Sequence, residues 1–237
     1  MALILNIETS TEVCSVALSK NGTLLFEKES HEGLNHSELL TVFIEGLFLE
    51  KNIKMSSLDA IAVSKGPGSY TGLRIGVSVA KGLCYALEIP LIGIGTIDAM
   101  GIFTAQNLGQ FSDIRLNENL LFCPMIDARR MEVYTALYNY KGERIKSVSA
   151  EIINADSFSN YLAKNKIFFF GNGAEKCKKQ LTHPNTVFEG PLKASARFMQ
   201  KLAEEKFKKN KFEDIAYFEP FYLKNFIATI PKNKLTQ

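Results

Sequence analysis

Two tight turns carry the polar side chains that could contact a phosphate group. The first is Glu8-Thr9-Ser10-Thr11 and the second is Asp127-Ala128-Arg129-Arg130, and each follows an apolar run. Two such turns can hold nucleotide phosphates when glycine lets backbone N–H groups approach without a Cβ in the way. Neither turn contains a glycine. The side chains of Arg129 and Arg130 stay candidate anion contacts, but the sequence predicts neither an ATPase nor a kinase.

A third candidate for anion binding is the loop Lys65-Gly66-Pro67-Gly68-Ser69, which precedes an expected helix. Flexible backbone before a helix N-terminus can bind an anion. The loop lacks the Gly-Lys-Ser/Thr ending of a P-loop, so a tight strand-to-helix turn is the alternative. Candidate nucleotide or anion contacts in this loop are Gly66, Gly68 and Ser69.

Residues for hydrolytic or metal chemistry are few. The three histidines, His31, His36 and His183, form neither H-E-x-x-H nor H-x-x-x-H, so we predict no metal ligands and no catalytic residues. A serine or cysteine mechanism would need a histidine within reach, and the sequence leaves that open. The four cysteines are far apart in apolar surroundings without a C-x-x-C pair, which favours buried, reduced thiols.

The composition is that of a folded protein, with 46% hydrophobic and 22% charged residues among 237. Charge is uneven: residues 1–140 carry 10 Lys and Arg against 15 Asp and Glu, whereas residues 141–237 carry 18 against 10. The basic second half favours either a solvated helix face, as at 201–211, or contact with RNA. No run approaches the ~20 apolar residues needed to span a membrane, and the N-terminus is typical of a first strand.

Strands and helices alternate in the first part of the chain, which predicts an α/β sheet with covering helices. Apolar alternation predicts strands over 3–9, 13–19 and 23–28, with a hairpin turn at Asn21-Gly22. Helical spacing predicts helices over 36–50 and 70–87. Further strands are expected over 60–64 and 91–94.

A second pass of the same kind begins near residue 120, with strands expected over 122–126, 132–140 and 144–150. Ile7-Glu8 and Ala17-Leu18 recur as Ile126-Asp127 and Ala136-Leu137, at a constant offset of 119 residues. This match predicts an internal duplication. We therefore expect an N-terminal lobe over 1–104, a polar linker over 105–119 and a trimmed C-terminal lobe over 120–237.

Three motifs resemble the TsaB (also called YeaZ) family: Ile4-Leu-Asn-Ile-Glu-Thr-Ser10, Gly66-Pro-Gly-Ser-Tyr-Thr-Gly-Leu-Arg-Ile-Gly76 and Asp127-Ala-Arg-Arg-Met-Glu-Val-Tyr134. The resemblance covers residues 1–140 and continues loosely to Tyr222-Leu223-Lys224. It implies a duplicated, actin-like two-lobe fold of the sugar kinase/Hsp70 superfamily with a reduced second lobe. It also implies a non-catalytic partner of TsaD, which places threonylcarbamoyl on the tRNA adenosine next to the anticodon.

The resemblance also shows what this sequence lacks. TsaD binds its catalytic metal through two histidines spaced H-x-x-x-H, and this chain has Thr96 and Met100 at the matching positions. We expect Thr96 to cap the next helix and Met100 to fill core. The implied role is a scaffold or activator that is not an enzyme. The alternative is a stand-alone enzyme, either a degenerate kinase or a glycoprotease-like peptidase.

The expected partner surface lies on the helices over 36–50 and 70–87. The second carries Gly72, Gly76 and Ala80 on one stripe, which predicts close approach either to the protein's own sheet or to a partner helix. By resemblance, these two helices meet TsaD in a heterodimer. Candidate interface residues are Leu39, Leu40, Phe43, Leu47, Gly72, Gly76, Val79 and Ala80.

The resemblance also sets expectations for ligands and location. TsaE would be a further member of the complex, tRNA would bind through the complex, and a homodimer would form without TsaD. No cofactor is expected on this chain alone, and ATP or ADP is a candidate ligand at the complex interface. The expected location is the cytoplasm, without a membrane partner.

Overall fold

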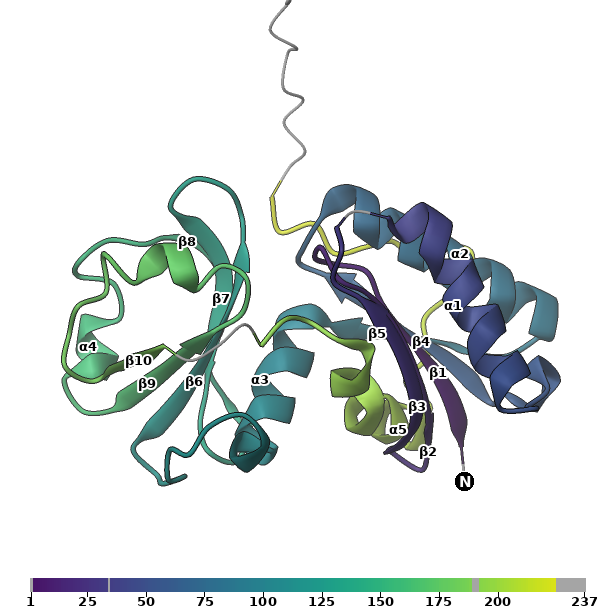
Figure 1. Ribbon diagram of the computed structural model, residues 1–237, viewed down its shortest axis with the longest axis horizontal. Coiled ribbons are helices and arrows are strands. Elements are labelled where there is room, and N and C mark those ends of the chain that lie inside the picture. The colour runs from purple at the N-terminus through teal and green to yellow at the C-terminus, as the bar shows by residue number, and fades with distance from the viewer. Residues whose placement is uncertain (1, 34, 189–191, 225–237) are drawn as a thin grey trace, which may run out of the picture.

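The computed structural model describes residues 2–33, 35–188 and 192–224, and it forms two lobes that face each other (Figure 1). Each lobe contains one five-stranded sheet. None of the helices in the described ranges is long and apolar enough to cross a membrane.

The first sheet has the strand order β3-β2-β1-β4-β5. Its strands are β1 (Leu3–Glu8), β2 (Cys14–Lys20), β3 (Thr23–Ser30), β4 (Ala60–Gly66) and β5 (Leu91–Gly95). The first three are antiparallel, and β4 and β5 continue the sheet in parallel. Asn21 and Gly22 turn between β2 and β3 with φ values of 54° and 74°, which confirms the predicted hairpin.

The second sheet repeats this arrangement, in the order β10-β9-β6-β7-β8. Its strands are β6 (Leu120–Asp127), β7 (Glu132–Tyr138), β8 (Arg144–Ile152), β9 (Lys166–Phe170) and β10 (Thr186–Phe188). Here too an antiparallel meander of three strands is extended by two parallel strands. The same order and directions in both lobes confirm the duplicated α/β fold.

Helices cover the outer faces of the sheets and fill the space between them (Figure 1). On the first lobe, α1 (His36–Glu50), η1 (Met55–Ser57) and α2 (Tyr70–Leu87) lie outside. Between the sheets lie α3 (Thr96–Gln106), η2 (Leu108–Gln110), η4 (Ala196–Met199) and α5 (Gln200–Lys208). The second lobe has only the short α4 (Ser159–Leu162) and η3 (Glu175–Cys177) on its outer face among the described residues, so its reduction affects helices and not strands.

His36 at the start of α1 is buried, and its Nε2 lies 3.2 Å from the carbonyl oxygen of Val13. Two sequence-based expectations are corrected by local details. Thr96 does not cap α3, because Gly95 is the N-cap residue. Met100 is in the core, as expected. The predicted linker over 105–119 begins inside α3 and continues through η2.

The chain returns to the first sheet after its second lobe. Both η4 and α5 contact strands of the first sheet, the N–H of Glu213 donates to the carbonyl oxygen of Leu91 at 2.9 Å, and Phe218 packs into the core beneath α1 and α2. The expectation that the second lobe extends to residue 237 is therefore wrong for 196–218. The lobe boundaries otherwise stay a prediction, and residues 225–237 lie outside the described residues.

Candidate functional site

A cavity of about 620 Å³ lies between the lobes, where the two glycine-free turns face each other. Residues 10–12 of the first turn and 127–130 of the second line it, together with residues 221–224 of the C-terminal segment. The sequence-predicted anion contacts that line it are Gly68, Ser69, Arg129 and Arg130. The charged lining residues balance: three carboxylates (Glu12, Asp127 and Glu132) against three cations (Arg129, Arg130 and Lys224).

Gly66 lies beneath the C-terminal segment and does not line this cavity. The N–H of Phe221 donates to the carbonyl oxygen of Lys65 at 2.6 Å. A Cβ on Gly66 would lie 2.7 Å from the carbonyl oxygen of Phe221, and the φ of Gly66 is 104°. Glycine at this position is therefore required by backbone packing, and the structure gives it no role as an anion contact in this cavity.

The two turns share one hydrogen bond at the offset of the duplication. In the first turn, the N–H of Ser10 donates to Oε1 of Glu8 at 2.6 Å. In the second, the N–H of Arg129 donates to Oδ1 of Asp127, also at 2.6 Å. Each turn thus satisfies, with its own carboxylate, a backbone donor that a phosphate cradle would direct at its ligand. This agrees with the prediction that the turns lack a backbone cradle.

The second turn is also held closed by a lysine from η3. Lys176 donates to the carbonyl oxygens of Arg130 and Glu132, each at 2.7 Å, and its Nζ lies 3.1 Å from Oδ1 of Asp127. Arg129 and Arg130 have φ values of 70° and 49°, which are uncommon for residues with a side chain. The ion pair and hydrogen bonds of Lys176 hold the turn in this conformation.

Glu12 joins the first turn to the second lobe. Its carboxylate accepts from Nδ2 of Asn172 at 2.6 Å and pairs with Lys193 at 3.2 Å, while Oδ1 of Asn172 accepts the N–H of Asp127. Burial acts to raise the pKa of Glu12, but the hydrogen bonds from its own backbone N–H, from Asn172 and from Lys193, together with the charge of Lys193, outweigh it, and the pKa is lowered. The carboxylate is therefore ionised and engaged, so it is a link between lobes and a poor general acid.

The glycine stripe of α2 packs against the first turn. A Cβ on Gly72 would overlap the carbonyl oxygen of Thr9, and one on Gly76 would overlap its Oγ1. A Cβ on Gly68 would lie 2.6 Å from the Cβ of Ser10. The stripe therefore meets the protein's own turn, and the expectation that Gly72 and Gly76 face a partner helix is wrong.

Among the described residues, no histidine hydrogen-bonds a serine hydroxyl or a thiol. His31 pairs with Oε1 of Glu29 at 3.1 Å, and the other oxygen of that carboxylate accepts from Ser195 at 2.9 Å. The carboxylate thus lies between serine and imidazole, so the imidazole cannot act as base toward the hydroxyl. His183 accepts the N–H of Asn185. The peptidase alternative gains no nucleophile from this arrangement.

The thiols are equally unsuited to nucleophilic attack. All four cysteines are free and buried, as the sequence predicted. Burial raises the pKa of Cys14 and Cys177 to about 11 and the pKa of Cys84 and Cys123 to about 12. The thiolate is the reactive form, and at neutral pH it is scarce at every one of these positions.

No group of three or more His, Cys, Asp and Glu side chains within the described ranges could hold a metal ion. Thr96 and Met100 are both buried, and Oγ1 of Thr96 has no hydrogen-bond partner. The thioether of Met100 is a soft ligand that does not suit a hard metal.

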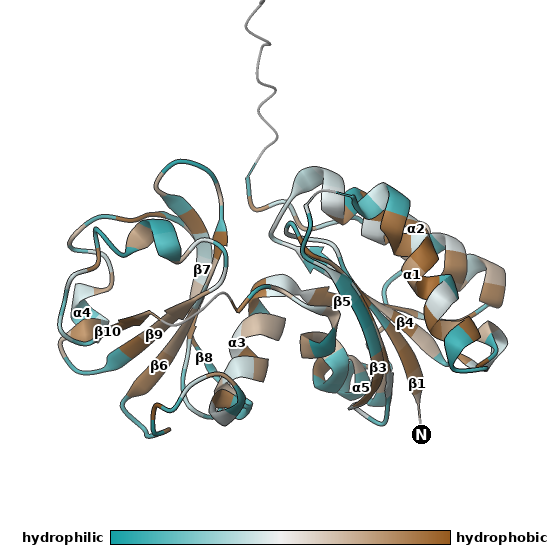
Figure 2. Cartoon of the chain, viewed as in Figure 1, coloured by the Kyte–Doolittle hydropathy of each residue, from teal (hydrophilic) through white to brown (hydrophobic). Residues whose placement is uncertain are grey.

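The outer face of α1 and α2 carries the large exposed apolar side chains of the first lobe's helices, and Figure 2 shows hydrophobic stretches on both. Val42, Leu49 and Tyr85 are 58%, 72% and 82% exposed. The predicted interface residues divide: Leu39, Phe43 and Val79 are partly exposed, whereas Leu40, Leu47, Gly72, Gly76 and Ala80 are buried within this chain. Leu39, Phe43 and Val79 pack against the core of the first lobe. We call the exposed Val42, Leu49 and Tyr85 the outer helix face.

Sequence reasoning missed Val42, Leu49 and Tyr85 because it followed the stripe that faces the sheet. A signal was present: apolar residues occupy most of the circumference of α1, and a helix that is apolar nearly all round is normally covered on more than one side.

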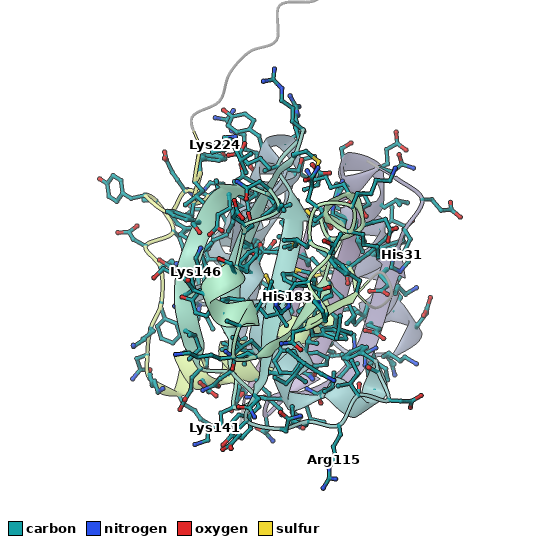
Figure 3. The ribbon with its side chains drawn as sticks, turned by 90° about the vertical axis from the view of Figure 1, so that its left-hand side faces the viewer. His31, Arg115, Lys141, Lys146, His183 and Lys224 are labelled. Carbon is teal, nitrogen blue, oxygen red and sulfur yellow. The ribbon has the colours of Figure 1, made fainter. Side chains whose placement is uncertain are left out.

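The Lys and Arg residues labelled in Figure 3 lie apart from one another. Figure 3 views the molecule from the second lobe and places Lys224 at one end and Arg115 and Lys141 at the other, with Lys146 between them. Several cations of the second half are paired with carboxylates, including Lys146 with Glu151. The solvated-face interpretation of the charge therefore has more support than a dedicated RNA surface.

Comparison with known proteins identifies the family. Residues 31–229 match the family model TsaD, described as tRNA N6-adenosine threonylcarbamoyltransferase. The chain is 29% identical to a TsaB of Bacillus subtilis, named a tRNA threonylcarbamoyladenosine biosynthesis protein, over 93% of each chain. It is 39% identical to a tRNA N6-adenosine threonylcarbamoyltransferase of Bacillus thuringiensis, but only over 39% of this chain and 32% of that protein.

A solved structure agrees. The structure of YeaZ from Pseudomonas aeruginosa superposes with a TM-score of 0.77 at 26% identity, over 94% of this chain and all of that one. The chain therefore belongs to the TsaD family, as one of its TsaB (YeaZ) members.

Proposed function

We propose that this protein takes part in tRNA threonylcarbamoyladenosine biosynthesis as a non-catalytic subunit that docks its outer helix face onto a catalytic TsaD protein. The exposure of Val42, Leu49 and Tyr85 on two adjacent helices is the observation that carries the proposal. Large exposed apolar side chains on two helices in contact favour a protein interface, and tyrosine is enriched among the residues that dominate binding.

The likeness to part of a transferase supports the choice of partner. This chain and a TsaD relative share 108 aligned residues at 39% identity. Two chains with a common ancestor can pair through equivalent faces, as the two subunits of a twofold dimer do. The same face would support a homodimer when the partner is absent.

The site chemistry supports a non-catalytic role. Both turns of the inter-lobe cavity use their own carboxylates to bind Ser10 and Arg129, and the thiols and histidines offer no nucleophile. ATP or ADP would then bind at the interface of the complex, not on this chain alone. TsaE and tRNA would join through the same complex.

Size-exclusion chromatography with light scattering, on this protein alone and mixed with TsaD from the same cell, tests the proposal. We expect a mixed complex that displaces any homodimer. Val42→Glu and Tyr85→Ala should each weaken it about tenfold or more, since interface hot spots contribute at least that much. Ile152→Glu is the matched control, because Ile152 is 73% exposed but lies on β8 of the other lobe.

Separate elution of the two proteins, with and without ATP and tRNA, would refute the docking proposal. Equal loss of binding in Ile152→Glu would refute the assignment of the interface to the outer helix face.

A further inference from the structure

A second cavity, of about 680 Å³, lies on the other side of the C-terminal segment from the first. Pro67 and Phe221 line both cavities, so the segment that Phe221 ties to Lys65 runs between them. The ends of β4 and β5, the start of α3, the β7–β8 hairpin and α5 supply the remaining walls. Its volume is in the range of small-molecule sites.

Three cations line this cavity against one carboxylate. We call Lys65, Arg144 and Lys206 the basic wall; the carboxylate is Asp98. Asp98 already accepts from the hydroxyl of Tyr138 at 2.7 Å and lies 3.6 Å from Nε of Arg144. It therefore neutralises at most one of the three cations.

The two lysines of the basic wall are only partly compensated. Lys65 lies 3.7 Å from Oε1 of Glu213, a loose pair, and Lys206 uses one of its donors on the carbonyl oxygen of Gly93 at 2.6 Å. Burial lowers the pKa of Lys206 and the nearby charge of Lys65 lowers it further, and the opposing charges of Glu213 and Asp98 do not fully offset them. A bound anion would offset the repulsion between the two amines.

Apolar side chains line the same cavity. Ile102, Val148 and Leu202 line the cavity and are each partly exposed; we call them the apolar wall. Ile102 comes from α3, Val148 from β8 and Leu202 from α5. A site of this kind, apolar with a few convergent polar groups, is typical of small-ligand binding.

We propose that this second cavity binds a small anionic molecule whose phosphate or carboxylate pairs with the basic wall and whose apolar body packs against the apolar wall. The site is distinct from the inter-lobe cavity of the two turns and from the outer helix face. Because its walls come from both lobes, an occupant would also hold the lobes together.

Titration of the ¹⁵N-labelled full chain with phenyl phosphate tests the proposal. The amide signals of Gly66, Gly95 and Gly142, which line this cavity, should shift in a saturable manner. Lys206→Met should weaken binding about tenfold or more, since a hydrogen bond to a charged group is lost. Lys209→Met is the matched control, because Lys209 is exposed just beyond α5 and does not line the cavity.

Three further probes define the ligand. Tighter binding of phenyl phosphate than benzoate identifies a phosphate ligand, and the reverse identifies a carboxylate. Inorganic phosphate that binds as tightly as phenyl phosphate would overturn the role of the apolar wall. Benzyl alcohol that binds as tightly would overturn the role of the basic wall.

A second variant keeps the proposal testable if Lys206→Met fails to fold. Arg144→Gln, on β8 of the other lobe, changes an exposed side chain and should weaken phenyl phosphate binding in the same direction. Shifts confined to Ser10 and Arg129 of the first cavity, or unchanged affinity in both variants, would overturn the proposal.

Discussion

The effect on stability of replacing glycine by alanine should change sign from one end of α2 to the other. Gly72, Gly76 and Gly82 lie in the same helix, so alanine brings each the same intrinsic gain of up to ~1 kcal/mol in helix propensity. What differs is the surrounding space. A Cβ on Gly82 meets nothing within 4 Å, whereas a Cβ on Gly72 lies closer than 3.0 Å to the backbone oxygen of Thr9.

The magnitudes follow from which atom must move. Overpacking costs about 1–3 kcal/mol, and more where the obstacle cannot rotate away. For Gly72→Ala the obstacle is backbone, so after the propensity gain we expect a net loss of about 2 kcal/mol or more. For Gly76→Ala the obstacle is the side-chain hydroxyl of Thr9, which can turn, so the loss should be about 1 kcal/mol or less. Gly82→Ala should stabilise by up to ~1 kcal/mol.

Thermal unfolding followed by far-UV circular dichroism measures these effects. For a chain of this length, 1 kcal/mol corresponds to about 2–4 °C in Tm, so Gly72→Ala should unfold about 4–8 °C earlier and Gly82→Ala about 2–4 °C later. Equal Tm values for Gly72→Ala and the unaltered protein, combined with lost TsaD binding, would refute the packing argument and return the stripe to the interface.

Three further predictions concern buried polar groups. The four thiols, those of Cys14, Cys84, Cys123 and Cys177, should resist a disulfide reagent at pH 8 in the folded protein and react after unfolding in urea. The reason is that burial raises the pKa of each thiol to about 11 or 12. A thiol that reacts quickly in the folded state would contradict its burial. Burial raises the pKa of Glu8 above 4.5, so the folded state holds this proton more tightly, and stability should fall as pH rises from about 4.5 through the folded pKa. In Glu8→Gln this part of the pH dependence should vanish, and an unchanged profile of urea stability against pH would show that Glu8 is not its source. Tyr138→Phe should lower the free energy of unfolding by about 1 kcal/mol, since it removes the hydrogen bond to Asp98. A variant as stable in urea as the unaltered protein would mean that water replaces the hydroxyl.

Strands and helices could be predicted because their signals are local. The hairpin at Asn21-Gly22 needs two positive φ values that these residues tolerate, and the structure has them. The repeat of Glu8 at Asp127 likewise identified the duplication before the matching sheets were known. Periodicity also showed correctly that Gly72 and Gly76 share a face of α2.

Periodicity shows which residues share a face of a helix, but not which part of the protein that face packs against. Only the fold places the turn at Thr9 against Gly72, because that contact joins residues more than sixty positions apart. The same limit applies to the C-terminal segment: nothing local at Phe218 or Phe221 indicates that they return to the first sheet. The hydrogen bond from the Arg129 N–H to Asp127 could more easily be predicted from the sequence, since an acidic side chain commonly accepts the N–H two residues on.

The same two carboxylates, those of Glu8 and Asp127, hold the turns in both lobes and occupy backbone donors that face the cavity. A turn that binds phosphate leaves backbone donors free for the ligand, and a donor left free in a closed protein costs stability. Here Glu8 and Asp127 accept those donors in both lobes, and Lys176 and Asn172 brace the second turn from neighbouring segments. The N–H groups of Ser10 and Arg129 are therefore satisfied without a ligand.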